Sequence, residues 1–267
     1  MGASESRRWS ERSVDTLARA SLDALFDNKI PAIRIKNFAS LAECAAFCAA
    51  TRAGALKHYN VQPPIGYIGM AQYEYRWDKP KEAYFADVAA ADAALRPVFD
   101  RSFDALQRVI DALAPHARGP VGVAKEPGLG AYFAGIVRVA AAGIRLHADF
   151  GPYNSPAYEV ARINAQLGWN IYFEMPGSGG ETIVYNRPWN PTMTGRTPPK
   201  SYGIDDADLA SAERFTFAPE VGELILFNSR NPHEVTAGEP GGPDRISIGA
   251  FVGRMPDGRL VMWSSSV

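Results

Sequence analysis

The spacing of the apolar positions changes at about residue 130. Before that point they recur every three or four residues, which predicts amphipathic helices. One apolar or small face runs over Val14–Leu25, and an aromatic and aliphatic stripe predicts a single helix over Pro97–Pro115. Ser40 followed by Glu43 is a capping box, and it predicts the start of an alanine-rich helix. A short alternation over Ile33–Lys36 predicts one half-buried strand among these helices.

After residue 130 the period falls to two, which is typical of short strands. The expected strands are Tyr132–Ala140, Ile144–Asp149, Leu167–Glu174, Glu181–Tyr185, Gly222–Phe227, His233–Thr236, Arg245–Val252 and Leu260–Trp263. Turns rich in glycine and proline separate most of them, and about eight such strands indicate a jelly roll or a related barrel. The sequence therefore predicts an α+β fold with mostly helical support over residues 1–130 and a β core over residues 131–267. We expect one domain over residues 1–267, because the strands alone would leave one face uncovered.

The composition narrows the class of protein. Apolar residues make up 46% and charged residues 21% of the 267 positions, values that are ordinary for a globular chain and exclude a disordered one. A net charge of −1 gives no basic footprint, so we expect neither nucleic acid nor an anionic membrane as a partner. The two cysteines, Cys44 and Cys48, are expected to be reduced core residues. We predict a cytoplasmic protein, monomeric or homodimeric, with a small-molecule ligand.

His147 and Asp149 are the first candidates for chemistry. Positions i and i+2 of a strand point to one face, so these two side chains are expected to lie side by side. His233 begins a later predicted strand and could supply a third ligand. Two histidines and one carboxylate leave open positions on a metal ion, the arrangement of non-haem Fe(II) oxygenases. A histidine and an aspartate on the surface of one strand would give the same local pattern.

Arg245 and Ser247 follow the second histidine on one predicted strand face. An inward arginine offers a planar fork to a carboxylate, and a hydroxyl two residues later shares its face. A surface arginine after a turn is the simpler interpretation, but the strongly apolar neighbours favour an interior strand.

Further segments accompany these residues in a fixed order: Ala134–Arg138, Gly179–Tyr185, Trp189–Pro191, Phe217–Asn228 and Val261–Ser264. Together with His147-x-Asp149, His233 and Arg245-x-Ser247, they resemble the Fe(II)/2-oxoglutarate-dependent dioxygenases. The finer features look like the branch that contains the free-standing halogenases of hapalindole- and welwitindolinone-type alkaloids and the hydroxylases of N-substituted amino acids. The resemblance covers about residues 130–264.

The resemblance implies a double-stranded β-helix core with N-terminal helices packed against it, and it implies Fe(II), 2-oxoglutarate and O2 as cofactor and cosubstrates. The implied catalytic and iron-binding residues are His147, Asp149 and His233. Arg245 would bind the distal carboxylate of 2-oxoglutarate with help from Ser247, and Arg138 would contact the carboxylate nearest the iron. The implied reaction is hydroxylation of an unactivated C–H bond of an amino-acid derivative or natural-product intermediate, with release of succinate and CO2.

Asp149 bears on the type of reaction. In the alkaloid halogenases that this chain resembles, a glycine replaces the carboxylate and chloride enters the vacant position. Because Asp149 occupies that position here, the resemblance implies hydroxylation rather than chlorination. Desaturation or ring formation would start from the same oxidant and stays open.

The expected substrate contacts are Arg76, Phe150, Tyr153 and Trp189, which flank the motif segments. Each could instead belong to the scaffold. Arg76 lies among aromatic residues, where it could bind a substrate carboxylate or make a rim salt bridge. The long polar segment Asn190–Ala212 is a candidate lid or substrate loop.

Two other functions share the predicted fold. A cupin-like isomerase or hydrolase would use the same metal ligands without redox chemistry. A non-catalytic jelly roll would bind a ligand without a metal. Succinate production separates the first function from both alternatives.

Overall fold

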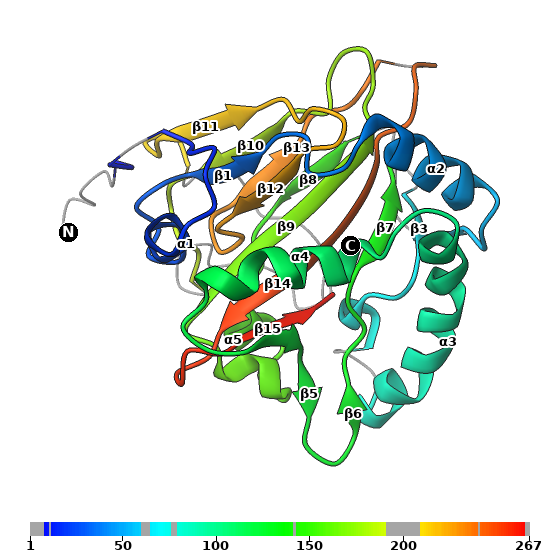
Figure 1. Ribbon diagram of the computed structural model, residues 1–267. Coiled ribbons are helices and arrows are strands. Elements are labelled where there is room, and N and C mark those ends of the chain that lie inside the picture. The colour runs from blue at the N-terminus through cyan, green and yellow to red at the C-terminus, as the bar shows by residue number, and fades with distance from the viewer. Residues whose placement is uncertain are drawn as a thin grey trace.

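Two antiparallel sheets form the centre of the computed structural model (Figure 1), which describes residues 8–10, 12–59, 65–75, 79–140, 143–190, 209–239 and 241–264. The large sheet contains β1 (Ala32–Ile35), β12 (Leu224–Phe227), β9 (Ala165–Glu174), β14 (Ile246–Arg254), β7 (Ile136–Val139), β3 (Gly66–Ile68) and β2 (Lys57–His58) in this order. It is extended beside β14 by β15 (Leu260–Trp263), which pairs in parallel with β4 (Val121–Val123).

The small sheet has the order β11 (Arg214–Phe217), β10 (Thr182–Tyr185), β13 (His233–Val235) and β8 (Ile144–His147). A separate ribbon joins β5 (Lys125–Glu126) and β6 (Gly130–Ala131). The helices are α1 (Arg19–Phe26), α2 (Leu41–Arg52), α3 (Lys81–Asp100), α4 (Ala105–Leu113) and α5 (Gly151–Asn154), with 3-10 turns η1 (Gln72–Tyr75), η2 (Ala114–His116) and η3 (Glu159–Arg162).

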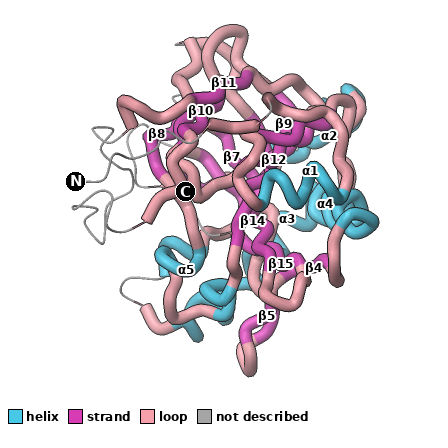
Figure 2. Tube along the Cα trace, turned by 90° about the vertical axis from the view of Figure 1, so that its left-hand side faces the viewer, coloured by secondary structure: helices cyan, strands magenta, loops and turns pink. Residues whose placement is uncertain are grey.

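Alternation along β9 and β12 separates the two sides of the large sheet. Leu167, Trp169, Ile171 and Phe173 of β9 belong to the core cluster shared with the helices, and Phe47 of α2 stacks on Phe173 with ring centroids 3.7 Å apart. Tyr172, one position out of phase, packs instead with Val184 and Phe217 of the small sheet. Figure 2 shows the result, with α1 and α4 on one side of the large sheet and β8 and β10 on the other.

The capping box predicted at Ser40 is confirmed. Ser40 N donates to Glu43 Oε2 at 2.8 Å, Glu43 N donates to Ser40 Oγ at 3.2 Å, and α2 begins at the next residue. Most of the strands expected after residue 130 are present with ends shifted by one or two residues, and β15 matches its prediction.

The predicted helix over Pro97–Pro115 is wrong in its boundaries. Pro97 lies near the end of α3, where it faces solvent, and α4 starts only at Ala105. Asp104 ends the break between them, because its Oδ1 accepts a hydrogen bond from Gln107 N at 2.9 Å and caps α4. The apolar stripe continues through the break, so its spacing alone did not reveal two helices.

The predicted helical face over Val14–Leu25 begins too early. Val14 is extended and forms a parallel bridge with Ile33, and α1 starts at Arg19. Strands β2 to β5 of the mostly helical first part were not expected, because two or three residues are too short to show alternation. None of the helices in the described ranges has the length and apolar content of a membrane-spanning segment.

The N-terminal strand completes one edge of the large sheet. Ala32 pairs with Phe227 and Ile35 pairs with Leu224 across β1 and β12. Arg34 on the same strand binds Glu223, a fully buried carboxylate, at 2.7 Å from Nε to Oε1. This contact holds the N-terminal segment against the core that carries the site.

Candidate metal centre

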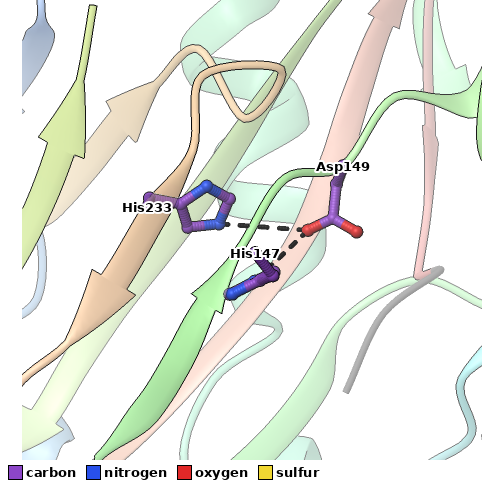
Figure 3. Close-up of side chains that lie close together, drawn as sticks. All are labelled: His147, Asp149 and His233. Atoms are coloured by element: carbon purple, nitrogen blue, oxygen red, sulfur yellow. Dashed lines mark ion pairs between the residues drawn. The ribbon is translucent and has the colours of Figure 1, made fainter. Parts of the chain in front are cut away.

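His147 and His233 lie opposite each other at one end of the small sheet. His147 is the last residue of β8 and His233 is the first of β13, and they are Cα partners across these antiparallel strands. Asp149 lies two residues beyond the end of β8, so the strand is shorter than predicted. Its Oδ2 is nevertheless 3.4 Å from His147 Nε2 and 3.9 Å from His233 Nε2 (Figure 3).

Hydrogen bonds to the Asp149 backbone fix its position, although Asp149 lies outside a strand. Asp149 N donates to Ser229 O at 2.8 Å, and Asp149 O accepts from Gln166 Nε2 of β9 at 3.1 Å. Ser229 precedes His233 by four residues, so these bonds connect the segment after β8 to the segment before β13. The carboxylate is thereby held between the two imidazoles.

Each imidazole is oriented by a carbonyl two residues before it. His147 Nδ1 is 2.7 Å from Arg145 O, and His233 Nδ1 is 2.8 Å from Asn231 O. A carbonyl oxygen only accepts, so Nδ1 carries the proton in both rings and the Nε2 lone pair faces Asp149. Burial lowers the pKa of His147 to about 4 and that of His233 to about 3, so both rings are neutral near pH 7.

These three residues fit a divalent metal ion. The donor atoms all lie within 4.8 Å of one another, and all three residues are buried. Donors about 2.1 Å from an ion and at right angles would lie about 3 Å apart, somewhat closer than the 3.4 and 3.9 Å between Asp149 Oδ2 and the two Nε2 atoms, so small side-chain shifts would bring them onto one ion. Two neutral imidazoles and one carboxylate form the donor set of facial Fe(II) sites, which leaves positions open for other ligands.

A buried cation lies in the same cavity. Arg245 is 4% exposed, and its guanidinium carbon lies 4.9 Å from the centroid of the Tyr172 ring. Arg245 Nε, the Tyr172 hydroxyl and Thr182 Oγ1 are buried and make no hydrogen bond of good geometry within the described residues. Burial lowers the pKa of Arg245, because desolvation disfavours the charged form. A buried cation with hydroxyl donors beside it requires an anionic ligand, and a carboxylate fits.

Two of the predicted 2-oxoglutarate residues, Arg138 and Ser247, are neighbours across the large sheet, and Arg245 directly precedes β14. Arg138 of β7 pairs with Ser247 of β14, and Ser247 pairs with Tyr172 of β9. Arg138 and Arg245 line the cavity together with the metal-site residues. Ser247 is buried but does not line the cavity.

Three of the four expected substrate residues lie together. Phe150 and Tyr153 are in edge contact with ring centroids 5.1 Å apart, and Tyr153 and Trp189 are 5.3 Å apart. Arg76 and residues 191–208 of the candidate lid lie outside the described residues.

Two side chains at this site were not identified from the sequence. Thr182 lies in the Gly179–Tyr185 segment that carries the resemblance, but its position beside Arg245 depends on how β10 packs. Arg230 lies between Asn228 and His233, and its contact with Phe150 comes from a loop whose course has no periodic signal.

Comparisons with known proteins agree with this geometry. The model of the family described as "Carrier-protein-independent halogenase WelO5" matches residues 9–264. Leucinostatins biosynthesis cluster protein S of Purpureocillium lilacinum is 35% identical over 218 residues, which is 77% of this chain and 88% of that protein. L-gamma-glutamyl-L-propargylglycine hydroxylase of Streptantibioticus cattleyicolor is 31% identical over 212 residues, covering 75% of each chain.

Solved structures show the same fold at low identity. An N-substituted L-amino acid dioxygenase from Burkholderia ambifaria matches with a TM-score of 0.63 at 17% identity, covering 92% of this chain and 91% of that one. The non-heme alpha-ketoglutarate-dependent epimerase SnoN matches with a TM-score of 0.51 at 12% identity, covering 90% and 87%. The resemblance predicted from the motifs is confirmed, and the chain belongs to the WelO5 family of Fe(II)/2-oxoglutarate-dependent oxygenases.

Proposed function

We propose that this oxygenase hydroxylates an unactivated C–H bond of a small molecule, an amino-acid derivative or a natural-product intermediate. The observation that carries the proposal is one cavity that contains both the His147, Asp149 and His233 donor set and the buried guanidinium of Arg245, which pairs with no carboxylate of the described ranges. The two facing sheets fit a double-stranded β-helix, in which such a cavity opens between the sheets.

His147, Asp149 and His233 would hold Fe(II), which with 2-oxoglutarate and O2 supplies the oxidising chemistry that converts a C–H bond to C–OH and releases succinate and CO2. The protein keeps the two Nε2 lone pairs directed at the ion through the Arg145 and Asn231 carbonyls. Asp149 adds one negative charge, which offsets part of the charge of the ion in this buried site.

Arg245 would bind the distal carboxylate of 2-oxoglutarate through its fork, and the Tyr172 and Thr182 hydroxyls would donate to the same group. Binding of a carboxylate would explain why Arg245 Nε, the Tyr172 hydroxyl and Thr182 Oγ1 are buried together without hydrogen-bond partners among the described residues. Arg138 of β7, which lines the same cavity and pairs with Ser247 of β14, would supply positive charge toward the carboxylate nearest the metal.

Asp149 favours hydroxylation over halogenation, although the family model is described by a halogenase. Its carboxylate occupies the third protein position beside both imidazoles, so a halide has no vacant protein position to enter. The relative that is named a hydroxylase supports the same choice.

Substrate would extend from the cavity toward Phe150, Tyr153 and Trp189, which pack on one another next to Asp149 but do not line the cavity itself. Phe150 follows the ligand Asp149 directly, so this aromatic cluster is within reach of the reacting centre. The rings offer apolar surface that positions a substrate and excludes water.

Anaerobic titration with Fe(II) and 2-oxoglutarate tests the assignment. We expect a weak visible charge-transfer band that His147→Ala abolishes, while His58→Ala, a change at an exposed histidine, leaves it intact. Persistence of the band in His147→Ala would refute the ligand set. Substrate-dependent succinate release tests the reaction, because a non-redox metalloenzyme and a ligand-binding jelly roll produce none.

A further inference from the structure

The Arg230 side chain packs against aromatic rings beside the metal centre. Its guanidinium carbon is 4.6 Å from the Phe150 ring centroid and 5.6 Å from that of Tyr153. Its Nε donates to Trp189 O at 2.9 Å. We call Phe150, Tyr153 and Trp189 the aromatic shelf.

The shelf and Arg230 are each connected to the metal centre through the backbone. Phe150 follows Asp149, so their Cα atoms are about 3.8 Å apart. Arg230 follows Ser229, whose carbonyl accepts from Asp149 N at 2.8 Å. The shelf and Arg230 do not line the cavity of the donor set, so they could contact the part of a substrate that extends beyond that cavity.

Within the described part of the chain, the charge of Arg230 is not balanced by an acid. Its described acceptors are the Trp189 carbonyl and, at 3.4 Å, the Tyr153 hydroxyl, both of which are neutral. Three other arginines with ring contacts pair with carboxylates, Arg34 with Glu223, Arg108 with Glu43 and Arg254 with Asp27, whereas Arg245, assigned above to 2-oxoglutarate, has no such pair among the described residues. Among the described residues, no carboxylate pairs with Arg230.

A purely structural role explains only part of this arrangement. Trp189 N donates to Arg230 O at 2.8 Å, and Arg230 Nε returns a bond to Trp189 O, so the two backbones are already braced. A guanidinium carries five N–H donors, and these contacts leave the rest of the fork available. The rings hold the cation in place by cation–π attraction, which leaves its orientation fixed before a ligand binds.

We propose that Arg230 on the aromatic shelf binds a carboxylate of the substrate, so the substrate of the proposed hydroxylase is a carboxylic acid. The planar fork matches a carboxylate with two parallel hydrogen bonds. The shelf contacts the apolar part of the same molecule. This inference rests on the proposed function, because it assigns the substrate of that same centre.

Binding is tested on protein loaded with Mn(II) and 2-oxoglutarate, which prevents turnover. The probes are the N-acetyl derivatives of L-valine, L-leucine and L-phenylalanine, each compared with its primary amide by calorimetric titration. We expect at least one acid to bind about 10–100-fold more tightly than its amide, the effect of one charge-assisted pair. In Arg230→Gln the affinity for that acid should fall to the affinity for its amide, and in Arg230→Lys part of the difference between the two affinities should return.

The control variant is Arg254→Gln, which removes another ring-contacting arginine that pairs with Asp27, and it should leave the preference unchanged. Arg230→Gln should also keep its affinity for 2-oxoglutarate within about twofold, which shows that the variant is folded and its cosubstrate site intact. Equal binding of every acid and its amide, or an acid preference that survives Arg230→Gln, would overturn the proposal. If the unmutated protein does not bind 2-oxoglutarate, that result would instead count against the proposed function.

Discussion

His147 and His233 face each other across β8 and β13 with ring centroids 4.1 Å apart, and each Nδ1 meets the carbonyl two residues before it. The same local geometry therefore occurs twice, once on each neighbouring strand. Because both tautomers are set by backbone atoms, the two Nε2 lone pairs converge on Asp149 before any metal binds.

The buried histidines predict how the stability of the metal-free protein depends on pH. Burial lowers their pKa values to about 4 and about 3, below the ordinary 6.5, so the unfolded chain binds more protons between pH 6.5 and 4. The free energy of unfolding should fall as the pH decreases through this window, by at most about 1.4 kcal/mol per pH unit for each histidine. Urea unfolding at several pH values measures the slope.

The slope can be assigned with two variants. The double change His147→Asn and His233→Asn should flatten it, whereas His58→Asn, at an exposed position, should not. An unchanged slope in the double variant would show that other groups dominate.

Asp149→Gly should remove the carboxylate while the backbone bonds to Ser229 and Gln166 remain. Hydroxylation should fall more than about 100-fold, since changes even to outer contacts of metal sites cost 10–100-fold. Added chloride should then shift the anaerobic Fe(II)/2-oxoglutarate band, because the third position is vacant.

Asp149→Asn fills the same space and is the matched control, in which chloride should have no effect. If chloride does not shift the band of Asp149→Gly, removal of the carboxylate alone does not create a halide site.

Arg245→Gln should weaken 2-oxoglutarate binding about 10–100-fold, the effect of losing one charge-assisted fork, with little change in Fe(II) affinity. The cause is spatial separation, since Arg245 lies on Tyr172 and is not one of the three clustered donors. Separate titrations of metal and cosubstrate measure the two effects. Equal loss of both affinities would contradict the assigned carboxylate contact.

Gly249→Ala should destabilise the wall of the cavity. A Cβ at Gly249 would lie 2.3 Å from Asn170 Oδ1 and 2.7 Å from Trp169 O, so β9 and β14 would have to separate. We expect a loss of about 1–3 kcal/mol in the free energy of unfolding, measured by urea denaturation. Gly122→Ala, where nothing lies within 4 Å, is the control and should change stability by less than about 0.5 kcal/mol.

Cys44 and Cys48 should resist alkylation in the folded protein. Both are free and buried, and burial raises their pKa values to about 11 and about 12, so almost no thiolate forms at pH 8. Iodoacetamide labelling followed by mass spectrometry should detect both only after unfolding. Rapid labelling of either cysteine in the native state would contradict their place in the core.

The proximity of His147 and Asp149 could be predicted because its signal is local. His147 and Asp149 are two residues apart, and this spacing kept them together even though β8 ends at His147. Thr182 and Arg230 gave no comparable signal. The position of Thr182 depends on β10 lying next to β13, and that of Arg230 on a loop packing against Phe150, and neither arrangement is encoded in the spacing of apolar residues.

The same distinction applies to the fold. Strands with several alternating residues were predicted well, because burial of one face requires that pattern. The break between α3 and α4 was not, because the apolar stripe keeps its phase while Asp104 starts a new helix. The hydrogen bond from Gln107 N to the Asp104 side chain sets the start of α4, and the apolar periodicity does not show it.

Strand β1 has a consequence for the biogenesis of this enzyme. Its partner β12 follows about 190 residues later in the chain, so β1 leaves the ribosome well before β12 is synthesised. Until then its apolar residues have no sheet to join, and pairing across so long a separation is slow. The large sheet can therefore be completed only after β12 has been synthesised, and until then β1 is expected to be exposed to aggregation unless chaperones shield it.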